Sequence, residues 1–405
     1  MSDVFQNDIE KQEQLKKIIK ALHDGKAVTE VKKDFARLLR NVSPQEISEM
    51  EQSLIKEGFP PEEIQRLCEV HVDVFRGALK KEKKPHKLPG HPVHTHMLEN
   101  LEAKKILKKL KPLVKKTVKG NGRHFSQFEQ EFNNLKQITL HYTRKENQLF
   151  PYLEKHNFTG PSKVMWGKHD EIRALLKMVE TDFREKNLVR FKENALSLIS
   201  KIGKMMFMEE RILFPTALKK LSDQEWADIR RGEAEIGYAW VSSESSSVKP
   251  GNLWDANLVA PVSTSVVPQQ TDSLKLDTGV LTLEQVNMML KALPLDISFV
   301  DENDKVLYYA NNPERVFPRS PAVIGRAVQN CHPPKSLHLV EAILADFRKK
   351  ERKEAEFWVN SKGRFLHIRY LPVYDAKGVY RGTLEITQDV TRIRQLEGEK
   401  RLLDS

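Results

Sequence analysis

The sequence has little cysteine and no long apolar run. Its 405 residues include two cysteines, Cys68 and Cys331. These fall in different expected domains, so we expect reduced thiols rather than a structural disulfide. No window approaches the roughly 18 uninterrupted apolar residues of a membrane-spanning helix, and the first residues lack the basic-then-apolar pattern of a secretory signal. We therefore expect a cytoplasmic protein without a membrane segment.

Motifs for DNA binding and for the output enzymes of signalling are absent as well. No helix-turn-helix, kinase, cyclase or phosphodiesterase motif is found, so a signalling role would need a downstream protein partner. The net charge of +11 is spread along the chain and gathers only in short runs at residues 80–84 and 115–116. Solvated helix faces and a linker account for this pattern, and a nucleic-acid partner is not expected.

Length and composition indicate several domains. The chain is 39% hydrophobic and 30% charged, which is typical of globular proteins, and domains of roughly 100–200 residues predict two to four units. We expect a small all-α domain over residues 1–80, a bundle of four antiparallel helices over residues 88–222, and an α+β domain with an antiparallel sheet over residues 283–395. Residues 241–278, rich in Ser, Pro, Asn and Gln, are expected to form a flexible linker.

An internal repeat marks the four-helix segment. The segment that begins at His141 matches the segment that begins at Met205 position for position, and both carry a glutamate just before Leu-Phe-Pro, which we interpret as a helix stop. These glutamates, Glu146 and Glu210, fall on the apolar stripes of their helices. Burying an ionised carboxylate is costly unless a cation or a strong donor compensates it. The two glutamates therefore imply a cation between them.

Histidines begin the other two helices. His94 on the first helix and His169 on the third are each followed by apolar residues at helical spacing. All four helices thus direct a candidate ligand inward. Imidazole and carboxylate without thiolate suit iron, manganese or zinc, and such side chains projecting from a bundle can hold two irons.

Residues 91–220 resemble the hemerythrin HHE cation-binding family. Its signature, a helix-borne histidine followed by acidic residues and Leu-Phe-Pro, appears at His141 and, in altered form, at Met205. The resemblance implies an up-down four-helix bundle with a carboxylate-bridged di-iron centre that binds or senses oxygen, nitric oxide or redox state. By position, the implied ligands are His94, His141, Glu146, His169 and Glu209 or Glu210.

The second helix departs from the family pattern. Where the family usually has a glutamate four residues after its histidine, this chain has Lys145, and Glu146 follows one residue later. Five residues separate His141 and Glu146 by about 140° around a straight helix. Joint ligation therefore needs a local π-bulge or a widely spaced metal pair.

The third and fourth helices depart as well. Met205 replaces the fourth-helix histidine, and Arg173 stands where a second third-helix histidine often occurs. The donors are few for two fully ligated irons, so a mononuclear or asymmetric site is an alternative. His91 or His96 would then supply a missing ligand, although His91 is equally explained as part of a helix start.

Single histidines on helices also have a plainer interpretation, because they are more often hydrogen-bonded or at the surface than bound to metal. Glu209, next to Glu210, is expected to face solvent. The plainer interpretation is preferred for His23, His96, His124 and His156.

The N-terminal segment, residues 1–80, resembles a bacterial domain of unknown function that is commonly found ahead of hemerythrin-like domains. The match is clearest at residues 42–50 and 64–71. Cys68 and His71 lie three apart on one helix face, which would suit a metal or a redox thiol. A buried cysteine beside a capped histidine is the preferred interpretation.

Residues 285–395 resemble a PAS fold, with residues 382–391 typical of the final strand and its exit into a helix. The resemblance implies a domain that senses small ligands or cofactors and mediates dimerisation. Cys331 and His332 are the candidates for cofactor binding, since either can ligate haem iron, but a proline-rich turn is preferred for this segment. No Cys-x-x-Cys-His motif and no flavin signature is present.

The sequence therefore predicts a sensor rather than an enzyme. A non-haem iron site, di-iron or mononuclear, would bind oxygen or nitric oxide, and the PAS domain would add a second input or a homodimer interface. One alternative is iron-centre repair or a di-iron redox enzyme, for which turnover under reductant would be decisive. Another is an iron or oxygen store, which would bind reversibly without passing a change to the PAS domain.

Overall fold

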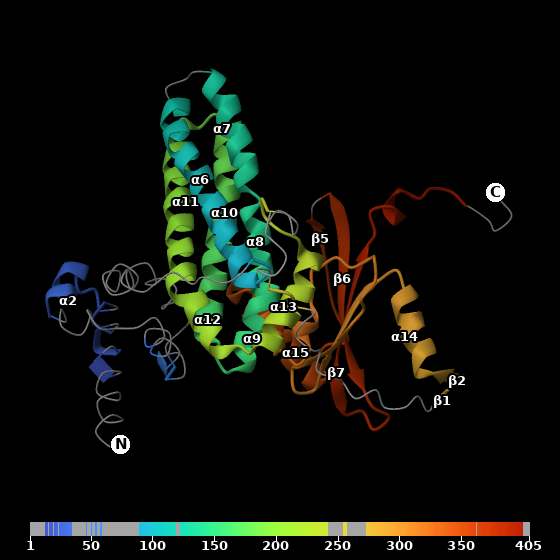
Figure 1. The fold of residues 1–405 in the computed structure, drawn as a ribbon. Coiled ribbons are helices and arrows are strands. Elements are labelled where there is room, and N and C mark those ends of the chain that lie inside the picture. The colour runs from blue at the N-terminus through green and yellow to red at the C-terminus, as the bar shows by residue number, and fades with distance from the viewer. Residues whose placement is uncertain are drawn as a thin grey trace, which may run out of the picture. The chain divides into compact units, whose positions relative to one another are not determined.

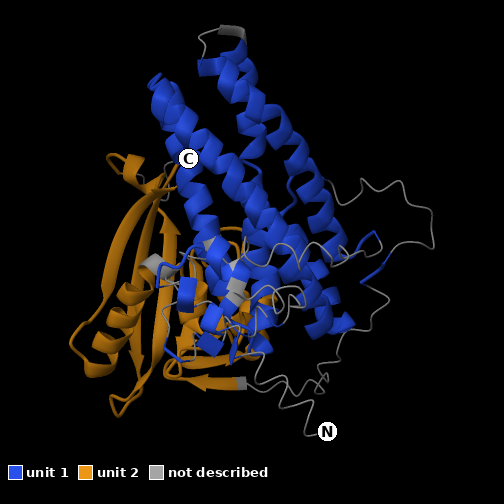
Figure 2. Cartoon of the chain, turned by 90° about the vertical axis from the view of Figure 1, so that its left-hand side faces the viewer, with its two compact units in different colours: residues 1–261 blue, residues 262–405 orange. Residues whose placement is uncertain are grey.

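The computed structural model describes residues 89–118, 122–241, 254–256 and 273–399 apart from residue 362, with scattered positions between 13 and 58. The chain divides into two compact units, residues 1–261 and 262–405 (Figure 2). The short helix α2 (Val28–Asp34) belongs to the N-terminal positions. Cys68, His71 and most of the expected linker lie outside the described residues. No described helix is both long and apolar enough to span a bilayer.

Four long helical segments lie side by side in the first unit (Figure 1), which confirms the expected bundle. The first segment is α6 (Pro92–Val118). The second is built from α7 (Gly122–Leu135), α8 (Ile138–Arg144), the π-helix η1 (Lys145–Leu149) and α9 (Phe150–Lys155). The third is α10 (Gly160–Arg184), and the fourth joins α11 (Leu188–Met208), the π-helix η2 (Glu209–Leu213) and α12 (Phe214–Lys220).

Aromatic side chains join three of these segments. The ring of Phe128 lies 5.3 Å from that of Phe132, 5.0 Å from that of Phe183 and 4.8 Å from that of Phe191. Buried aromatic contacts of this kind contribute both apolar area and a preferred geometry. The cluster fixes the second, third and fourth segments against one another, about two to three turns from the polar residues of α8.

Two prolines shape the turns that carry the candidate site. Pro151 and Pro215 have no N–H to donate, and a proline ring clashes with the carbonyl four residues back. The phenylalanine before each proline instead donates to a carbonyl five residues back, that of Lys145 in η1 and that of Glu209 in η2. The helix stop that we expected at Leu-Phe-Pro is therefore wrong. Helices α9 and α12 continue beyond it, and the prolines only widen the preceding turn.

The widened turns bury two neighbouring residues on each helix, because a π-turn holds more residues than an α-turn. Lys145 and Glu146 are 0% and 3% exposed, and Glu209 and Glu210 are 0% and 4% exposed. The π-bulge that would allow His141 and Glu146 to face the same interior is thus present. It recurs at the matching position of the second repeat.

A further helix, α13 (Asp223–Ile236), was not assigned from the sequence. It begins with a capping box, in which Ser222 accepts from the N–H of Glu225 and the Glu225 carboxylate accepts from the N–H of Ser222 at 2.8 Å. The side-chain amide of Gln148, in η1, donates to the carbonyl of Gly232 in α13 at 2.7 Å. Helix α13 therefore holds the π-turn η1 from outside.

The second unit contains a five-stranded antiparallel sheet, which confirms the expected α+β architecture. The strand order is β4 (Val306–Tyr309), β3 (Asp296–Asp301), β7 (Tyr380–Asp389), β6 (Arg364–Tyr374) and β5 (Ala355–Ser361). Helices α14 (Leu283–Ala292) and α15 (Pro334–Lys349) and a hairpin of β1 (Ser273–Leu276) and β2 (Gly279–Thr282) accompany it. Apolar side chains of β3, β4, α15 and two 3-10 helices, Pro321–Val323 and Val328–Cys331, form its core: Val300, Val306, Val323, Val328 and Leu344.

The exit from β7 differs from the expected helix start. Among the described residues up to 399 it forms a short 3-10 turn, Ile393–Gln395. The carboxylate of Asp389 accepts hydrogen bonds from the N–H and the hydroxyl of Thr391. Such local side-chain bonds compete with helix formation, and Leu396, which is 68% exposed, adds no packing that would favour a helix.

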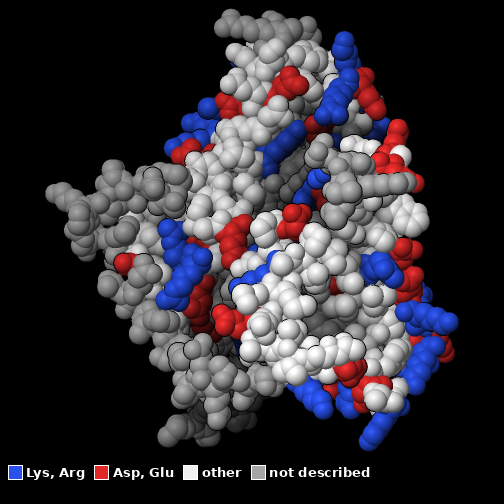
Figure 3. Space-filling view, turned by 90° about the vertical axis from the view of Figure 1, so that its right-hand side faces the viewer, with Lys and Arg blue, Asp and Glu red and all other residues white. Residues whose placement is uncertain are grey.

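Charges of both signs are mixed on one face of the molecule. On the face drawn in Figure 3, Lys and Arg side chains are interspersed with Asp and Glu. Some are paired in the second unit, where Arg352 lies 2.8 Å from Asp346 and Arg369 lies 2.6 Å from Glu354. This mixed pattern agrees with the diffuse charge of the sequence.

We predict that Gly232→Ala lowers the free energy of unfolding by about 1–2 kcal/mol. A Cβ at residue 232 would lie 2.5 Å and 2.6 Å from the amide atoms of the buried Gln148 side chain. Gly203→Ala in α11 is the matched control, because nothing lies within 4 Å of its added Cβ, and it should stabilise by about 0.5–1 kcal/mol. Denaturant unfolding followed by circular dichroism measures both. Equal stabilisation by the two changes would contradict the contact between η1 and α13.

Candidate metal centre

A chain of polar side chains crosses the interior of the bundle, and we refer to it as the buried network. Its members come from α6, α8, η1, α10 and η2, and each contacts the next through a hydrogen bond or an ion pair. All are at most 3% exposed except Arg173, whose side chain is 25% exposed. They are His96, Glu99, His141, Arg144, Lys145, Glu146, His169, Arg173 and Glu209.

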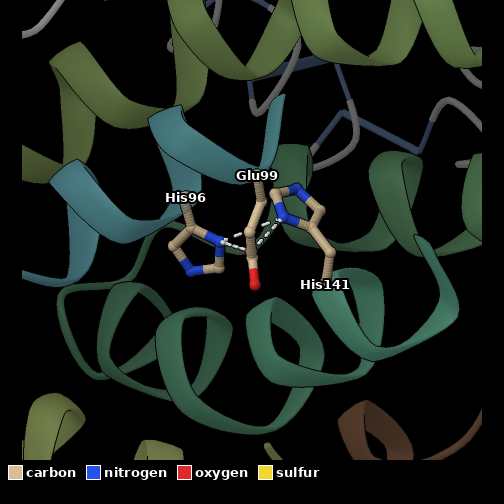
Figure 4. Close-up of side chains that lie close together, drawn as sticks. All are labelled: His96, Glu99 and His141. Carbon is tan, nitrogen blue, oxygen red and sulfur yellow. Dashed lines mark hydrogen bonds and ion pairs between the residues drawn. The ribbon is translucent and has the colours of Figure 1, made fainter. Parts of the chain in front are cut away.

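Glu99 of α6 supports His141 of α8 from behind. Nδ1 of His141 lies 2.7 Å from Oε2 of Glu99, and Arg144 donates to both oxygens of that carboxylate. His96, one turn before Glu99, points to the same place (Figure 4), and its Nδ1 lies 3.3 Å from Nδ1 of His141. Ligand atoms of His96, Glu99 and His141 lie within 4.8 Å of one another, a spacing compatible with one cation.

Protein donors already satisfy Glu99. Burial alone would raise its pKa, but the Arg144 guanidinium and the hydrogen bond from His141 hold the pKa of Glu99 well below its usual range. Burial lowers the pKa of His96 to about 3, and Arg144 adds to this effect. Glu99 also accepts from the N–H of Ala239 at 2.8 Å. A carboxylate has about four acceptor positions, and Arg144, His141 and Ala239 fill them.

Glu146 of η1 supports His169 of α10 in the same way. Its Oε1 lies 2.7 Å from Nδ1 of His169, and Arg173 donates to its two oxygens at 2.9 Å and 2.7 Å. Burial lowers the pKa of His169 well below its usual range, and Lys145 adds to this. The ring is therefore neutral, so that Nδ1 donates to Glu146 and Nε2 is left as an acceptor. Tyr142 stacks on this ring, with centroids 4.1 Å apart.

The remaining nitrogens of the two histidines face the middle of the buried network. Nε2 of His141 lies 3.2 Å from Oε2 of Glu209. The other oxygen, Oε1, forms a close ion pair with the ammonium of Lys145, and this ammonium lies 3.1 Å from Nε2 of His169. These side chains thus contact one another in the order His141, Glu209, Lys145 and His169, and the Glu209 carboxylate connects His141 to Lys145.

The pair of Lys145 and Glu209 is fully buried. Burial opposes ionisation of Glu209, yet Lys145 and His141 hold the pKa of Glu209 below its usual range. Burial also lowers the pKa of Lys145, and Glu209 opposes that effect. A buried charge that loses its partner typically costs about 3–5 kcal/mol, so each member of the pair stabilises the other.

Both histidines have the surroundings of metal ligands. A histidine that binds a metal almost always donates its other ring N–H to a carboxylate, a carbonyl or a water, which fixes the tautomer and the ring orientation. Glu99 does this for His141, and Glu146 does it for His169. The other ring nitrogen of each histidine, Nε2, therefore has a fixed direction toward the middle of the network, where it meets Glu209 or Lys145.

The predicted ligands His141, Glu146 and His169 all belong to the buried network. Glu210 is buried as well, but it pairs with Lys104 of α6. His94 is half-buried on α6 and contributes none of the contacts just described.

His91 lies outside the network, at the start of α6. Its Nδ1 accepts from the N–H of Val93 at 3.1 Å. Its ring packs 4.8 Å from that of Trp226 and 4.9 Å from that of Trp254. These contacts are those of a residue that fixes a helix start.

The sequence misplaced or missed two acidic members. Glu209 does not face solvent as expected, because the π-turn η2 turns it inward beside Glu210. No motif in the sequence singles out Glu99, although its spacing of three from His96 places both on one helix face. The sequence identified Lys145 and Arg173 as departures from the family pattern, and the structure shows them as the cations that compensate buried glutamates.

The two cofactor candidates of the second unit lie at the end of a 3-10 helix, Val328–Cys331. Cys331 packs against the core, with its sulfur 3.7 Å from the carbonyl of Ala327. Burial lowers the pKa of His332. These contacts describe a packed turn, and a cofactor role for the pair stays a prediction.

The buried network fits one metal ion and does not fit two. Nε2 of His141 and Oε2 of Glu209 lie 3.2 Å apart, the spacing of neighbouring ligands that each bind one ion at about 2 Å. Between Glu209 and His169, the corresponding place is filled by the Lys145 ammonium. An ammonium has three donors and no acceptor, so it cannot ligate. The di-iron centre implied by the family resemblance does not fit these residues as they stand.

Three family models match successive parts of the chain and confirm the resemblances inferred from its motifs. Residues 15–81 match a family of unknown function, DUF438. Residues 91–217 match the hemerythrin HHE cation-binding domain, and residues 286–391 match a PAS domain. Together the last two domains suggest a metal-binding sensor, and they fit small-ligand binding with dimerisation or signalling. The cluster of His96, Glu99 and His141 is compatible with cation binding.

Several solved structures are similar to parts of the chain. The C-terminal domain of a protein from Streptococcus mutans is 34% identical, covers 32% of this chain and 100% of its own, and has a TM-score of 0.30. A sensory box sensor histidine kinase from Vibrio cholerae is 13% identical over 26% of this chain and 90% of its own, with a TM-score of 0.21. A PAS domain from Colwellia psychrerythraea is 17% identical over 27% and 98%, with a TM-score of 0.21. No curated protein matches the chain. The chain thus carries, in order, a DUF438 segment, a hemerythrin HHE cation-binding domain and a PAS domain.

Proposed function

We propose that the protein is a sensor whose hemerythrin domain binds one non-haem metal ion, with iron as the favoured metal, on the His141 side of the buried network. The observation that carries the proposal is the position of His141, held by Glu99 on one side and facing Glu209 on the other. His141 and Glu209 would bind the ion. A first-helix histidine, His94 or His96, would complete the set.

The donor set suits iron, because imidazole and carboxylate ligands without thiolate are those of non-haem iron sites. A bound ferrous ion would supply an open position for a diatomic molecule such as oxygen or nitric oxide. The protein residues orient and enclose this position. Glu99 fixes the tautomer of His141, and Arg144 keeps Glu99 ionised.

Burial of the centre favours sensing over the alternatives. His141, Lys145, His169 and Glu209 are each 0% exposed, so a small diatomic molecule is a better fit than the larger substrates of a repair enzyme. A single ion in each chain is also a small capacity for a store. The PAS domain on the same chain supplies a module through which a change in the bundle can be passed on.

We predict that the full chain, prepared metal-free and titrated anaerobically with ferrous iron, binds one iron per chain. His141→Gln should abolish this binding, because it removes the ligand that Glu99 orients. His156→Gln is the control, since His156 pairs with Glu225 at 2.8 Å and its side chain is 39% exposed. Metal analysis with calorimetry measures the stoichiometry. Two irons per chain, or equal losses in the two variants, would overturn the single-ion site.

The site is also predicted to be asymmetric. Glu99→Gln should weaken iron binding by about 10–100-fold, the usual effect of removing a carboxylate that orients a ligand histidine. Glu146→Gln is a matched change, because Glu146 is equally buried, is paired with an arginine and supports the other histidine. It should alter the iron affinity less than about threefold. Similar losses in both variants would place ions on both sides, and a larger loss in Glu146→Gln would place the ion on the His169 side.

The sensing role has its own test. Nitric oxide added to the iron-loaded chain should change the visible spectrum and also the hydrogen exchange of residues 283–395, which form the PAS domain. The His141→Gln variant, treated in the same way, should show neither change. A spectral change without any effect on exchange in the PAS domain would favour the storage alternative.

A further inference from the structure

Lys145 lies where a cation belongs in the buried network. Its ammonium touches Oε1 of Glu209 and lies 3.1 Å from Nε2 of His169. These two partners mirror the pair on the other side, where Nε2 of His141 lies 3.2 Å from Oε2 of the same carboxylate. Each oxygen of Glu209 therefore faces a place beside one histidine: in the His169 place the Lys145 ammonium lies between the oxygen and the ring, whereas in the His141 place the oxygen and the ring nitrogen are in direct contact.

The surroundings of the His169 place hold the ammonium firmly. Lys145 is 0% exposed, and its ammonium also lies 4.7 Å from the ring centroid of Tyr142, a distance at which a cation is attracted to an aromatic face. Tyr142 in turn stacks on His169. The ammonium is thus enclosed by a carboxylate, an imidazole and an aromatic face, which together satisfy a positive charge.

A second protein cation, Arg173, lies on the same side of the buried network as Lys145. Arg173 holds Glu146 with two hydrogen bonds and occupies a position at which a histidine would supply another donor. An arginine cannot be deprotonated in proteins and accepts nothing. Two protein cations, Lys145 and Arg173, therefore compensate the two carboxylates on the His169 side.

We propose that the Lys145 ammonium replaces a second metal ion, so that the centre is built for one metal ion and one protein-borne cation joined by Glu209. This inference rests on the proposed function for the identity of the first place. It explains how the His169 side keeps its charge balance, its histidine orientation and its carboxylate bridge without a second ion.

The replacement also links the centre to helix α13. Lys145 and Gln148 belong to the same π-turn, η1, and the Gln148 amide donates to Gly232 of α13. Binding of metal to the other oxygen of Glu209 would change the strength of the ion pair between Glu209 and Lys145. Because Lys145 belongs to η1, this change would act on η1 directly. Helix α13, which contacts η1 through Gln148, would then be the next element to respond.

Charge at residue 145 is tested first with the metal-free full chain. Lys145→Gln removes the charge but keeps a hydrogen-bond donor, and it should lower the Tm by on the order of 10 °C. Lys145→Arg keeps the charge and should lower the Tm by less than half as much. The double change Lys145→Gln with Glu209→Gln removes both charges and should recover most of the loss. An unchanged Tm in Lys145→Gln would overturn the proposal.

Ion capacity is tested with Lys145→Glu, which exchanges the ammonium for a carboxylate at the position where the family carries one. Titrated anaerobically with ferrous iron, this variant should bind one more iron per chain than the unmodified protein, and iron should raise its Tm. Lys145→Arg should bind no additional iron. Equal iron content in Lys145→Glu and the unmodified chain would overturn the proposal. If Lys145→Glu does not fold, the Tm series decides.

The outcomes separate this inference from the proposed function. One iron in the unmodified chain and two in Lys145→Glu support both. No iron in the unmodified chain and one in Lys145→Glu would remove the proposed function and leave the replacement by Lys145 intact. One iron in each would keep the function and remove the replacement.

Discussion

The bundle depends on compensating the carboxylates that it buries. An ionised carboxylate in an apolar interior costs several kcal/mol unless a partner of opposite charge and full hydrogen bonding offsets the loss of water. Glu99, Glu146 and Glu209 are all at most 3% exposed. Arg144, Arg173 and Lys145, respectively, compensate them. In this bundle, protein side chains therefore supply most of the positive charge that ions would supply in a metal-filled bundle.

Two prolines make this compensation possible. Pro151 and Pro215 widen the turns before them, and each widened turn brings a second residue into the interior. Without η1, Lys145 and Glu146 would point in directions about 100° apart on a regular helix. With it, Glu146 supports His169 while Lys145 reaches Glu209. The two copies of the sequence repeat thus form two π-turns that face each other. Their contact places the Glu209 carboxylate between His141 and Lys145.

The architecture followed from the sequence, whereas the charge pairing within the centre did not. Apolar periodicity located the four helical segments and the antiparallel sheet, since both depend on patterns that recur over many residues. A period of 3.6 residues per turn predicts Glu209 at the surface, but this period does not hold in the π-turn η2, which turns Glu209 inward. In the sequence, Lys145 is visible only as a missing ligand, because the family motif specifies metal donors and does not specify which side chain carries the positive charge in their absence.

Anomalous diffraction at the iron edge, from crystals of the full chain equilibrated anaerobically with ferrous iron, would locate bound iron relative to Glu209 and Lys145. We expect a single iron peak about 2 Å from Nε2 of His141 and from a Glu209 oxygen, with the Lys145 ammonium still between Glu209 and His169. Two iron peaks flanking Glu209, with the Lys145 side chain displaced, would contradict this expectation.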